Sequence, residues 1–318
     1  MLSGSAALPP LKKNVAAFPS PDRDQLKEAL QSGGASDFDA KKGKLSISTY
    51  INILFTNPSL SAENPASDFY PIPTCSLNEL TATKAAFNIK EAELFSGSIR
   101  LDLSVNGLIG VGAFKTAQSA QLTLLPLRRS GIGSRSNHNI VLKRPYVDDK
   151  SKPGPPFMHY ILTDESNLLY REANILYWAK ALLKLTYDFI DHAVNDASAL
   201  PPFEIPRLRF IDAGLVFAYS FATVATNASE KTGQSVRPGG TVSTIYLAEE
   251  LIPMSSEGEF VKYIHNGNAV PCDLFDTEAN KIAEFLAFMQ HVQYAKTDSQ
   301  VYISDYQGMF FWRFNFAN

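Results

Sequence analysis

A glycine-rich segment in the first half of the chain has the composition of a phosphate-binding loop. Gly107, Gly110 and Gly112 lie within residues 107–115, directly after the alternating apolar segment 98–105. Glycines let the backbone turn tightly and bring its N–H groups close to phosphate oxygens. The segment lacks the Gly-Lys-Ser/Thr ending of a Walker loop, and strand-like residues follow it instead of the helix of a dinucleotide-binding fingerprint. It is therefore either a glycine loop between two strands that covers a nucleotide or an ordinary hairpin that contains glycines.

Lys143 follows the apolar residues 140–142, one predicted hairpin after the glycine segment. Its ammonium group could act as a point charge on nucleotide phosphates. A lysine at the exit of a strand is also common without any ligand. Glu172 lies near the apolar stripe of a predicted helix, where a carboxylate is costly unless it is paired. Lys143 is a candidate partner for it, and a solvated glutamate at the edge of the stripe is the alternative.

The segment 244–252 has the pattern of a hinge between two parts of the chain. It is apolar, contains Glu249 and Glu250, and runs into Pro253. Backbone groups at such a break could bind an adenine edge. An edge strand with two solvated acids is the alternative.

Three polar residues near the C-terminus could take part in proton transfer or metal binding. Asp305 follows an apolar segment, and its carboxylate could accept a substrate hydroxyl proton or hold Mg²⁺. Gln307 could orient a phosphate or a metal-bound water. His291 ends a predicted helix, where a lone histidine is more often structural than a metal ligand.

The elements that must position these residues are predicted from hydrophobic periodicity. Strands are expected at 98–105, 120–127, 139–142, 208–211, 215–222, 244–252 and 301–303, and helices at 166–192 and 277–291. Ser166 is expected to cap the first helix. The first three strands are expected to form an antiparallel meander. This order indicates an α+β protein with two lobes: an antiparallel sheet with one long helix, then a mixed α/β lobe.

The N-terminal region, residues 1–77, is rich in Pro, Ser, Ala, Asn and Asp. We expect it to be largely disordered, because proline-rich punctuation argues against a packed core. Two islands within it could be ordered, a helix at 23–31 and an apolar strand at 45–55. Residues 78–318 are predicted to form the folded domain.

Composition and charge limit the classes of function. The 318 residues include 29 Lys+Arg and 32 Asp+Glu, so there is no global basic field and no nucleic-acid partner is expected. Two cysteines exclude a disulfide scaffold. The start of the chain is unlike a signal peptide, and no apolar run is long enough to cross a bilayer. We therefore expect an intracellular, cytoplasmic protein without a membrane partner.

Six segments, in order and with matching spacing, resemble the alpha-type protein kinases, the atypical kinases that include the myosin heavy chain kinases and elongation factor 2 kinase. They are 110–117 (GVGAFKTA), 141–143 (VLK), 179–182 (AKAL), 247–252 (LAEELI), 259–266 (EFVKYIHN) and 288–308, which contains the helix histidine and the sequence Asp-Tyr-Gln-Gly. Ile264 replaces an asparagine of the family pattern. The resemblance covers about residues 94–308.

The resemblance implies a two-lobed kinase-like fold that binds ATP in a cleft and transfers its γ-phosphoryl group to a serine or threonine of a protein substrate. It implies that Lys143 contacts the phosphates, that Asp305 is the catalytic acid and that His291 is a zinc ligand. Gln307 would lie at the magnesium–phosphate end of the site. The implied nucleotide-binding residues are Gly110, Gly112, Ala113, Phe114, Lys115, Lys143, Glu249, Glu250, Ile252 and Asn266.

The sequence after Gly308 departs from the family pattern. The family continues with an aspartate that holds magnesium and a Cys/His cluster that completes the zinc site, whereas residues 309–318 contain no Asp, Cys or His. The domain is therefore expected to be truncated and its zinc site incomplete, since zinc usually takes four ligands. Three hypotheses follow: a serine/threonine kinase that is weakly active or inactive, a catalytically dead ATP-binding pseudokinase or interaction module, and an α+β domain that binds no nucleotide.

Overall fold

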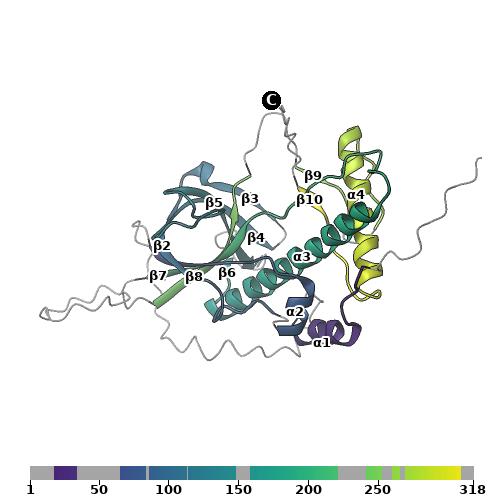
Figure 1. Cartoon of the computed structure of the whole chain (residues 1–318). Helices are drawn as coiled ribbons and strands as arrows, with labels where there is room; N and C mark the ends of the chain where they lie inside the picture. Colours follow the sequence, from purple (N-terminus) through teal and green to yellow (C-terminus); the bar gives the residue numbers. More distant parts are fainter. Residues whose placement is uncertain are drawn as a thin grey trace, which may run out of the picture.

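The computed structural model describes residues 18–33, 65–83, 86–112, 114–147, 158–220, 241–252, 260–265 and 269–308. These residues form an α+β protein in which a large antiparallel sheet packs against a long helix, as Figure 1 shows. The α+β class predicted from the sequence is therefore confirmed. Within these residues, no helix is long and apolar enough to span a membrane.

The main sheet has eight strands in the order β3-β4-β2-β1-β7-β8-β5-β6. Its strands are β1 (Ala66–Pro71), β2 (Phe95–Leu101), β3 (Leu108–Val111), β4 (Lys115–Leu124), β5 (His138–Val147), β6 (Met158–His159), β7 (Ala213–Ser220) and β8 (Thr241–Glu250). A second, two-stranded sheet pairs β9 (Val261–Lys262) with β10 (Gln307–Gly308). The helices are α1 (Arg23–Gly33), α2 (Leu77–Thr83), α3 (Leu162–Asp196) and α4 (Thr277–Lys296).

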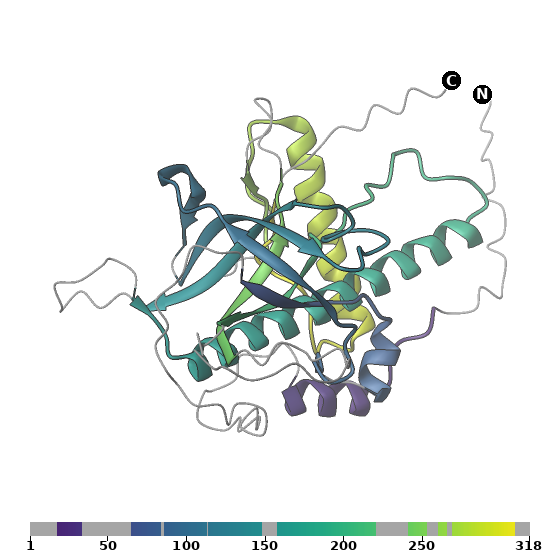
Figure 2. The same ribbon diagram turned by 90° about the vertical axis from the view of Figure 1, so that its left-hand side faces the viewer.

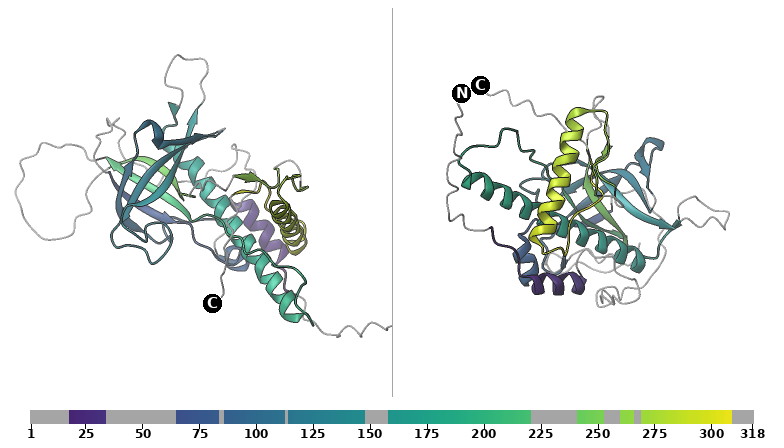
Figure 3. Two further views of the ribbon diagram at one scale, coloured as in Figure 1. Left: turned by 90° about the horizontal axis from the view of Figure 1, so that it is seen from above. Right: turned by 90° about the vertical axis from the view of Figure 1, so that its right-hand side faces the viewer.

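The main sheet closes on itself, because β4 pairs with β5 as well as with β2 and β3. Six strands, β4, β2, β1, β7, β8 and β5, thus form a ring, and Figure 3 shows the curvature of the sheet. Side chains alternate between the two faces of a strand, so each strand sends every second residue into the ring. All six strands contribute to one buried cluster, which includes Phe69, Ile99, Leu122, Leu142 and Val216.

The long helix α3 covers the outer face of β7 and β8. Leu169, Ala173 and Trp178 of α3 share a buried cluster with Leu215 of β7 and Leu247 of β8. Helices α1 and α2 pack into the same cluster, and Figure 2 shows them below α3. The C-terminal half of α3 contacts α4, where Leu183 packs on a third cluster built around α4. One helix therefore joins the barrel to the elements that carry residues 301–308.

The structure changes several predicted elements. Residues 208–211 and 301–303 are not strands. Helix α3 begins at Leu162, with Ile161 at the cap position and no side-chain cap. Ser166, the predicted cap, lies one turn inside the helix, and its hydroxyl donates to the Leu162 carbonyl. The error arises because the apolar stripe becomes recognisable only after the first turn, which is acidic.

The predicted division of the chain after residue 77 cuts through the sheet. Strand β1 lies between β2 and β7, and Phe69 is fully buried inside the ring. The prolines that suggested an irregular region do not prevent this, because Pro71 is the last residue of β1, where a missing N–H is tolerated. The predicted helix at 23–31 is confirmed as α1, and the predicted strand at 45–55 lies outside the described residues.

Candidate functional site

The strand register places the predicted lysines and the predicted hinge glutamate on one face of the sheet. Lys143 of β5 is opposite Ala117 of β4 and opposite Leu247 of β8. Cross-strand partners share a face, and residues two apart along a strand do too. Lys115, Lys143 and Glu249 therefore lie on the outer face, where Leu247 packs against α3.

Lys143 and Glu249 form an ion pair, with 2.6 Å between Nζ and Oε2. Only 13% of the Glu249 side chain is exposed. The structure thus brings together two residues that the sequence placed in separate motifs, one on an inner strand and one before the hinge. The ammonium group of Lys143 therefore lies beside the glycine hairpin, where it could bind an anionic ligand.

Glu172 of α3 pairs with Lys115 at the start of β4, at 2.5 Å between Oε2 and Nζ. The suggestion that Lys143 is its partner is therefore wrong. The sequence could not decide between the two lysines, because both lie on the same face of neighbouring strands. The consequence is that each of the two lysines predicted to bind the nucleotide is paired with a different carboxylate.

Sequence reasoning missed a third ion pair, between Arg144 of β5 and the first turn of α3. Arg144 donates to Glu165 in the first turn of α3, and its guanidinium lies 5.9 Å from the centre of the Tyr246 ring. Glu165 is fully buried, and this burial raises the pKa of its carboxyl group while Arg144 opposes the rise. The available signal was that Arg144 follows Lys143 directly. Two successive residues of a strand point to opposite faces, so Arg144 needed a carboxylate partner other than that of Lys143.

The glycine segment forms the hairpin between β3 and β4. The Gly112 N–H donates to the Lys115 carbonyl, and the Tyr146 hydroxyl donates to the Gly112 carbonyl, both at 2.8 Å. No described atom lies within 4 Å of the position that a Cβ on Gly110 would take. Phe114 at the turn is 77% exposed. Tyr146 thus holds the turn of the hairpin at Gly112, and there is open space beside Gly110.

Asp305 and Gln307 lie in the C-terminal part of the structure, beside β9. Lys262 forms an ion pair with the Asp305 carboxylate, and Gln307 is the register partner of Lys262. Asp305 has a φ of 62°, in the left-handed region that non-glycine residues rarely adopt. Such backbone strain persists where the surroundings fix the conformation, and it clusters at functional sites.

The remaining predicted residues are dispersed. Glu250 pairs with Arg209 at 2.5 Å, and Ile252 is partly buried just beyond β8. His291 is exposed on α4. Ala113 and Asn266 lie outside the described residues.

The resemblance implies two metal ions, zinc and magnesium, and the described residues suit only the second. Within the described ranges, no three His, Cys, Asp or Glu side chains gather where they could hold a metal ion. Zinc, which usually takes four protein ligands, does not fit His291 there. Magnesium is commonly held by one or two side chains together with substrate phosphates, and the oxygens of Asp305 and Gln307 have the required chemistry.

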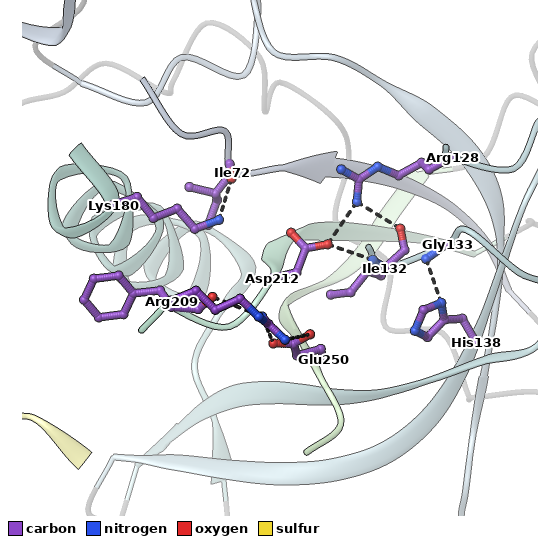
Figure 4. Close-up of polar contacts among 10 residues, drawn as sticks. Ile72, Arg128, Ile132, Gly133, His138, Lys180, Arg209, Asp212 and Glu250 are labelled. Carbon is purple, nitrogen blue, oxygen red and sulfur yellow. Dashed lines mark hydrogen bonds and ion pairs between the residues drawn. The ribbon is translucent and has the colours of Figure 1, made fainter. Parts of the chain in front are cut away.

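Asp212 connects the β4–β5 loop to the end of β8, and Figure 4 shows this contact. Its carboxylate accepts from the Ile132 N–H at 2.7 Å and from Arg128 at 3.2 Å. Its backbone carbonyl accepts from the Glu250 N–H at 3.0 Å. The loop turns at Gly131, whose φ is 70° and where an added Cβ would lie 2.1 Å from the Asp212 carboxylate. Asp212, the residue before β7, therefore holds the β4–β5 loop against the last residue of β8, inside the predicted hinge segment.

His138 and Lys180 lie near Asp212 and are also drawn in Figure 4. The Gly133 N–H donates to Nδ1 of His138 at 3.2 Å, and burial followed by the nearby Arg135 lowers the pKa of this histidine. Lys180 of α3 is buried and donates to the Ile72 carbonyl at 2.8 Å. Burial lowers the pKa of Lys180 as well. Sequence reasoning noticed Lys180 only as part of a family segment.

The fold and the site define an α+β protein with a closed antiparallel sheet whose outer face carries two ion-paired lysines beside a glycine hairpin. The model of the Alpha-kinase family matches residues 110–317. Because this match spans more than half of the chain, the protein belongs to the alpha-kinase family. No curated protein sequence gives a significant match.

Several solved structures are similar to this chain. The apoenzyme alpha-kinase domain of myosin-II heavy chain kinase A is 12% identical, with a TM-score of 0.41, over 79% of this chain and 80% of that chain. The alpha-kinase domain of myosin heavy chain kinase A in complex with ADP is 14% identical, with a TM-score of 0.36, over 78% and 80%. The family membership rests on the family model alone, since both TM-scores are below 0.5.

Proposed function

We propose that this chain binds ATP and transfers its γ-phosphoryl group to a serine or threonine hydroxyl of a protein substrate. Membership of the alpha-kinase family makes it a protein kinase by descent. The observation that carries the proposal is the Lys143–Glu249 ion pair on the face of the sheet beside the glycine hairpin. The alpha-type resemblance of the sequence motifs supports the choice of serine and threonine.

In this proposal the two lysines bind the phosphates. Lys115 and Lys143 lie on neighbouring strands and each is held by one carboxylate. ATP phosphates would compete with Glu172 and Glu249 for these ammonium groups. The hairpin would lie over the phosphates, with the open space beside Gly110 facing them. Phosphoryl transfer depends mainly on positioning and on charge stabilisation, which these groups provide.

At the other end of the proposed site, Asp305 accepts the proton of the substrate hydroxyl. Its exposed carboxylate must leave Lys262 or share it, because a carboxylate that stays fully paired is a weak base. Magnesium, when bound, would neutralise phosphate charge, and the side-chain oxygen of Gln307 would help to hold it. Glu249, Glu250 and Ile252 would contact the adenine from the end of β8.

ATP binding without phosphoryl transfer is the second candidate function. The Lys262–Asp305 ion pair favours it, because it occupies the group that would have to accept the proton. The two candidates share the nucleotide site and differ only in chemistry. They are therefore separated by measuring binding and transfer on the same variants.

The test of ATP binding is the melting temperature of the purified chain with and without Mg-ATP. ATP at about 100 times its Kd should stabilise the fold by roughly 2.7 kcal/mol. Lys143→Ala should abolish this shift. Lys281→Ala, which removes a lysine paired with Glu278 on α4, is the matched control and should keep it. A shift that survives Lys143→Ala would contradict the proposed site.

The test of transfer uses [γ-³²P]ATP with a mixture of serine-, threonine- and tyrosine-containing peptides, followed by phosphoamino acid analysis. We expect phosphoserine or phosphothreonine, and loss of both in Asp305→Asn with ATP binding unchanged. Binding without any labelled product would support the second candidate. Phosphotyrosine as the main product would contradict the serine/threonine assignment.

A further inference from the structure

The loop between α4 and β10 is held by two glutamine side chains of α4, which hydrogen-bond the backbone N–H and the backbone carbonyl of one residue, Ile303. Oε1 of Gln293 accepts from the Ile303 N–H at 2.8 Å. Nε2 of Gln290 donates to the Ile303 carbonyl at 2.8 Å. The two glutamines are three residues apart on α4, so they point to the same side of the helix. Together they give Ile303 the two hydrogen bonds that a neighbouring strand would give.

Both glutamines are buried, and Gln293 is also hydrogen-bonded to a second helix. Gln293 has no exposed surface, and its Nε2 donates to the hydroxyl of Thr186 on α3 at 3.2 Å. The Thr186 hydroxyl in turn donates to the Leu182 carbonyl at 2.9 Å. Buried amides are costly unless they are hydrogen-bonded, so each of these bonds constrains the geometry. The contacts run from the loop through α4 to α3, the helix that also packs on the barrel.

The loop is fixed at its two ends as well. The Val301 N–H donates to the Thr297 hydroxyl at 3.2 Å. The Tyr306 carbonyl accepts from the Tyr263 N–H at 2.9 Å, and the Tyr306 side chain is buried. Asp305 lies between Ile303 and Tyr306. Its left-handed backbone is therefore determined by fixed residues on both sides.

We propose that Gln290 and Gln293 are positioning residues that hold the Asp305 carboxylate where phosphoryl transfer requires it. They act through the backbone of Ile303 and do not touch the substrate. The inference rests on the proposed function for the role of Asp305. The clamp, meaning the Gln290 and Gln293 side chains bonded to Ile303, rests on the hydrogen bonds described above. A carboxylate displaced by about 1 Å can cost on the order of a hundredfold in rate. A clamp that sets the backbone two residues before Asp305 controls a displacement of this size.

The experiment compares Gln293→Met and Gln290→Met with Gln300→Met. Methionine keeps the approximate volume of glutamine and removes its hydrogen bonds. Gln300 lies on the same loop, and its side-chain amide donates to the nearby Asp298 carbonyl. For each clamp variant we expect kcat to fall about tenfold or more, with the Kd for ATP within twofold of the wild type. Gln300→Met should leave both constants unchanged.

Hydrogen–deuterium exchange gives a second measurement that needs no activity. Protection of the Ile303 amide should fall in Gln293→Met, while amides in β4 and β5 keep their protection. Thr186→Val removes the anchor of Gln293 on α3 and should cause the same change to a smaller extent. This variant keeps the proposal testable if Gln293→Met does not fold.

The failure of this inference can be distinguished from failure of the proposed function. A wild-type chain that transfers no phosphate would contradict the proposed transfer, and the positioning role with it, while the exchange data would still report on the clamp. The positioning role would be overturned if transfer is present and the clamp variants keep wild-type kcat. It would also be overturned if kcat and ATP affinity fall in parallel, which indicates general loosening of the fold. Unchanged exchange at Ile303 in Gln293→Met would overturn the clamp itself.

Discussion

Lys143 and Glu249 face each other from adjacent strands, with 2.6 Å between the ammonium nitrogen and a carboxylate oxygen. The lysine proposed to bind phosphate is therefore held by the glutamate proposed to lie at the adenine end of the site. An ATP molecule would have to replace this contact. The pair links the stability of the empty protein to its affinity for nucleotide.

The first prediction concerns the contribution of this ion pair to the free energy of unfolding of the protein. Lys143→Met should destabilise the chain by roughly 1–3 kcal/mol, because it leaves the largely buried Glu249 carboxylate uncompensated. Glu249→Gln should cost less, since Lys143 is more exposed. The double variant should cost less than the sum of the two, as residues in direct contact do not act independently. Urea denaturation of the four proteins measures the coupling, and strict additivity would show that the pair contributes nothing.

The second prediction concerns Glu172 and nucleotide affinity. Glu172→Gln should lower the Kd for ATP severalfold, because the carboxylate that competes with phosphate for Lys115 is removed. Isothermal titration with ATP measures the effect at two salt concentrations, and the gain should shrink at high salt. Glu28→Gln, on the exposed face of α1, is the control and should leave the Kd unchanged. Weaker ATP binding in Glu172→Gln would mean that Glu172 orients Lys115 for the ligand.

The third prediction uses two glycines in different surroundings. Gly131→Ala should destabilise the chain by roughly 2–4 kcal/mol, since its φ is 70° and its Cβ would meet the Asp212 carboxylate. Gly110→Ala should change stability little, because no described atom is close to its Cβ position. The same Gly110→Ala variant should weaken ATP binding if phosphates occupy that space. Equal stability of the two alanine variants, measured by thermal unfolding, would be evidence against the Asp212 contact.

The fourth prediction concerns stability below neutral pH. The pKa of His138 is lowered in the folded state, so the unfolded chain takes up a proton first as the pH falls below about 6.5. This histidine therefore reduces stability as the pH falls from about 6.5 through its folded pKa, and has no effect above that range. His138→Gln keeps an acceptor for the Gly133 N–H and should flatten this part of the stability curve. A stability curve that His138→Gln leaves unchanged would contradict this prediction.

Periodicity predicted the elements whose pattern is long and regular. The helices α3 and α4 and the strands β2, β4, β5, β7 and β8 all occur where alternation or helical spacing placed them, with shifted ends. The failures have a common cause. Strand β1 is six residues long and ends at a proline, so its neighbours in sequence suggested disorder, and only pairing with β2 and β7 makes it a strand. The apolar residues 208–211 and 301–303 find no strand partner and stay irregular.

The sequence by itself determined the α+β class, the glycine hairpin before a lysine-bearing strand, and the family, because these depend on residue order and local pattern. Only the tertiary structure decided which carboxylate pairs with which lysine. Lys115, Lys143, Glu172 and Glu249 come from four elements, and their pairing follows from strand register and the packing of α3. For the same reason, the hydrogen bonds of Gln290 and Gln293 to Ile303 could not be predicted from the sequence. The two glutamines look like ordinary polar residues of a helix until the loop folds back onto α4.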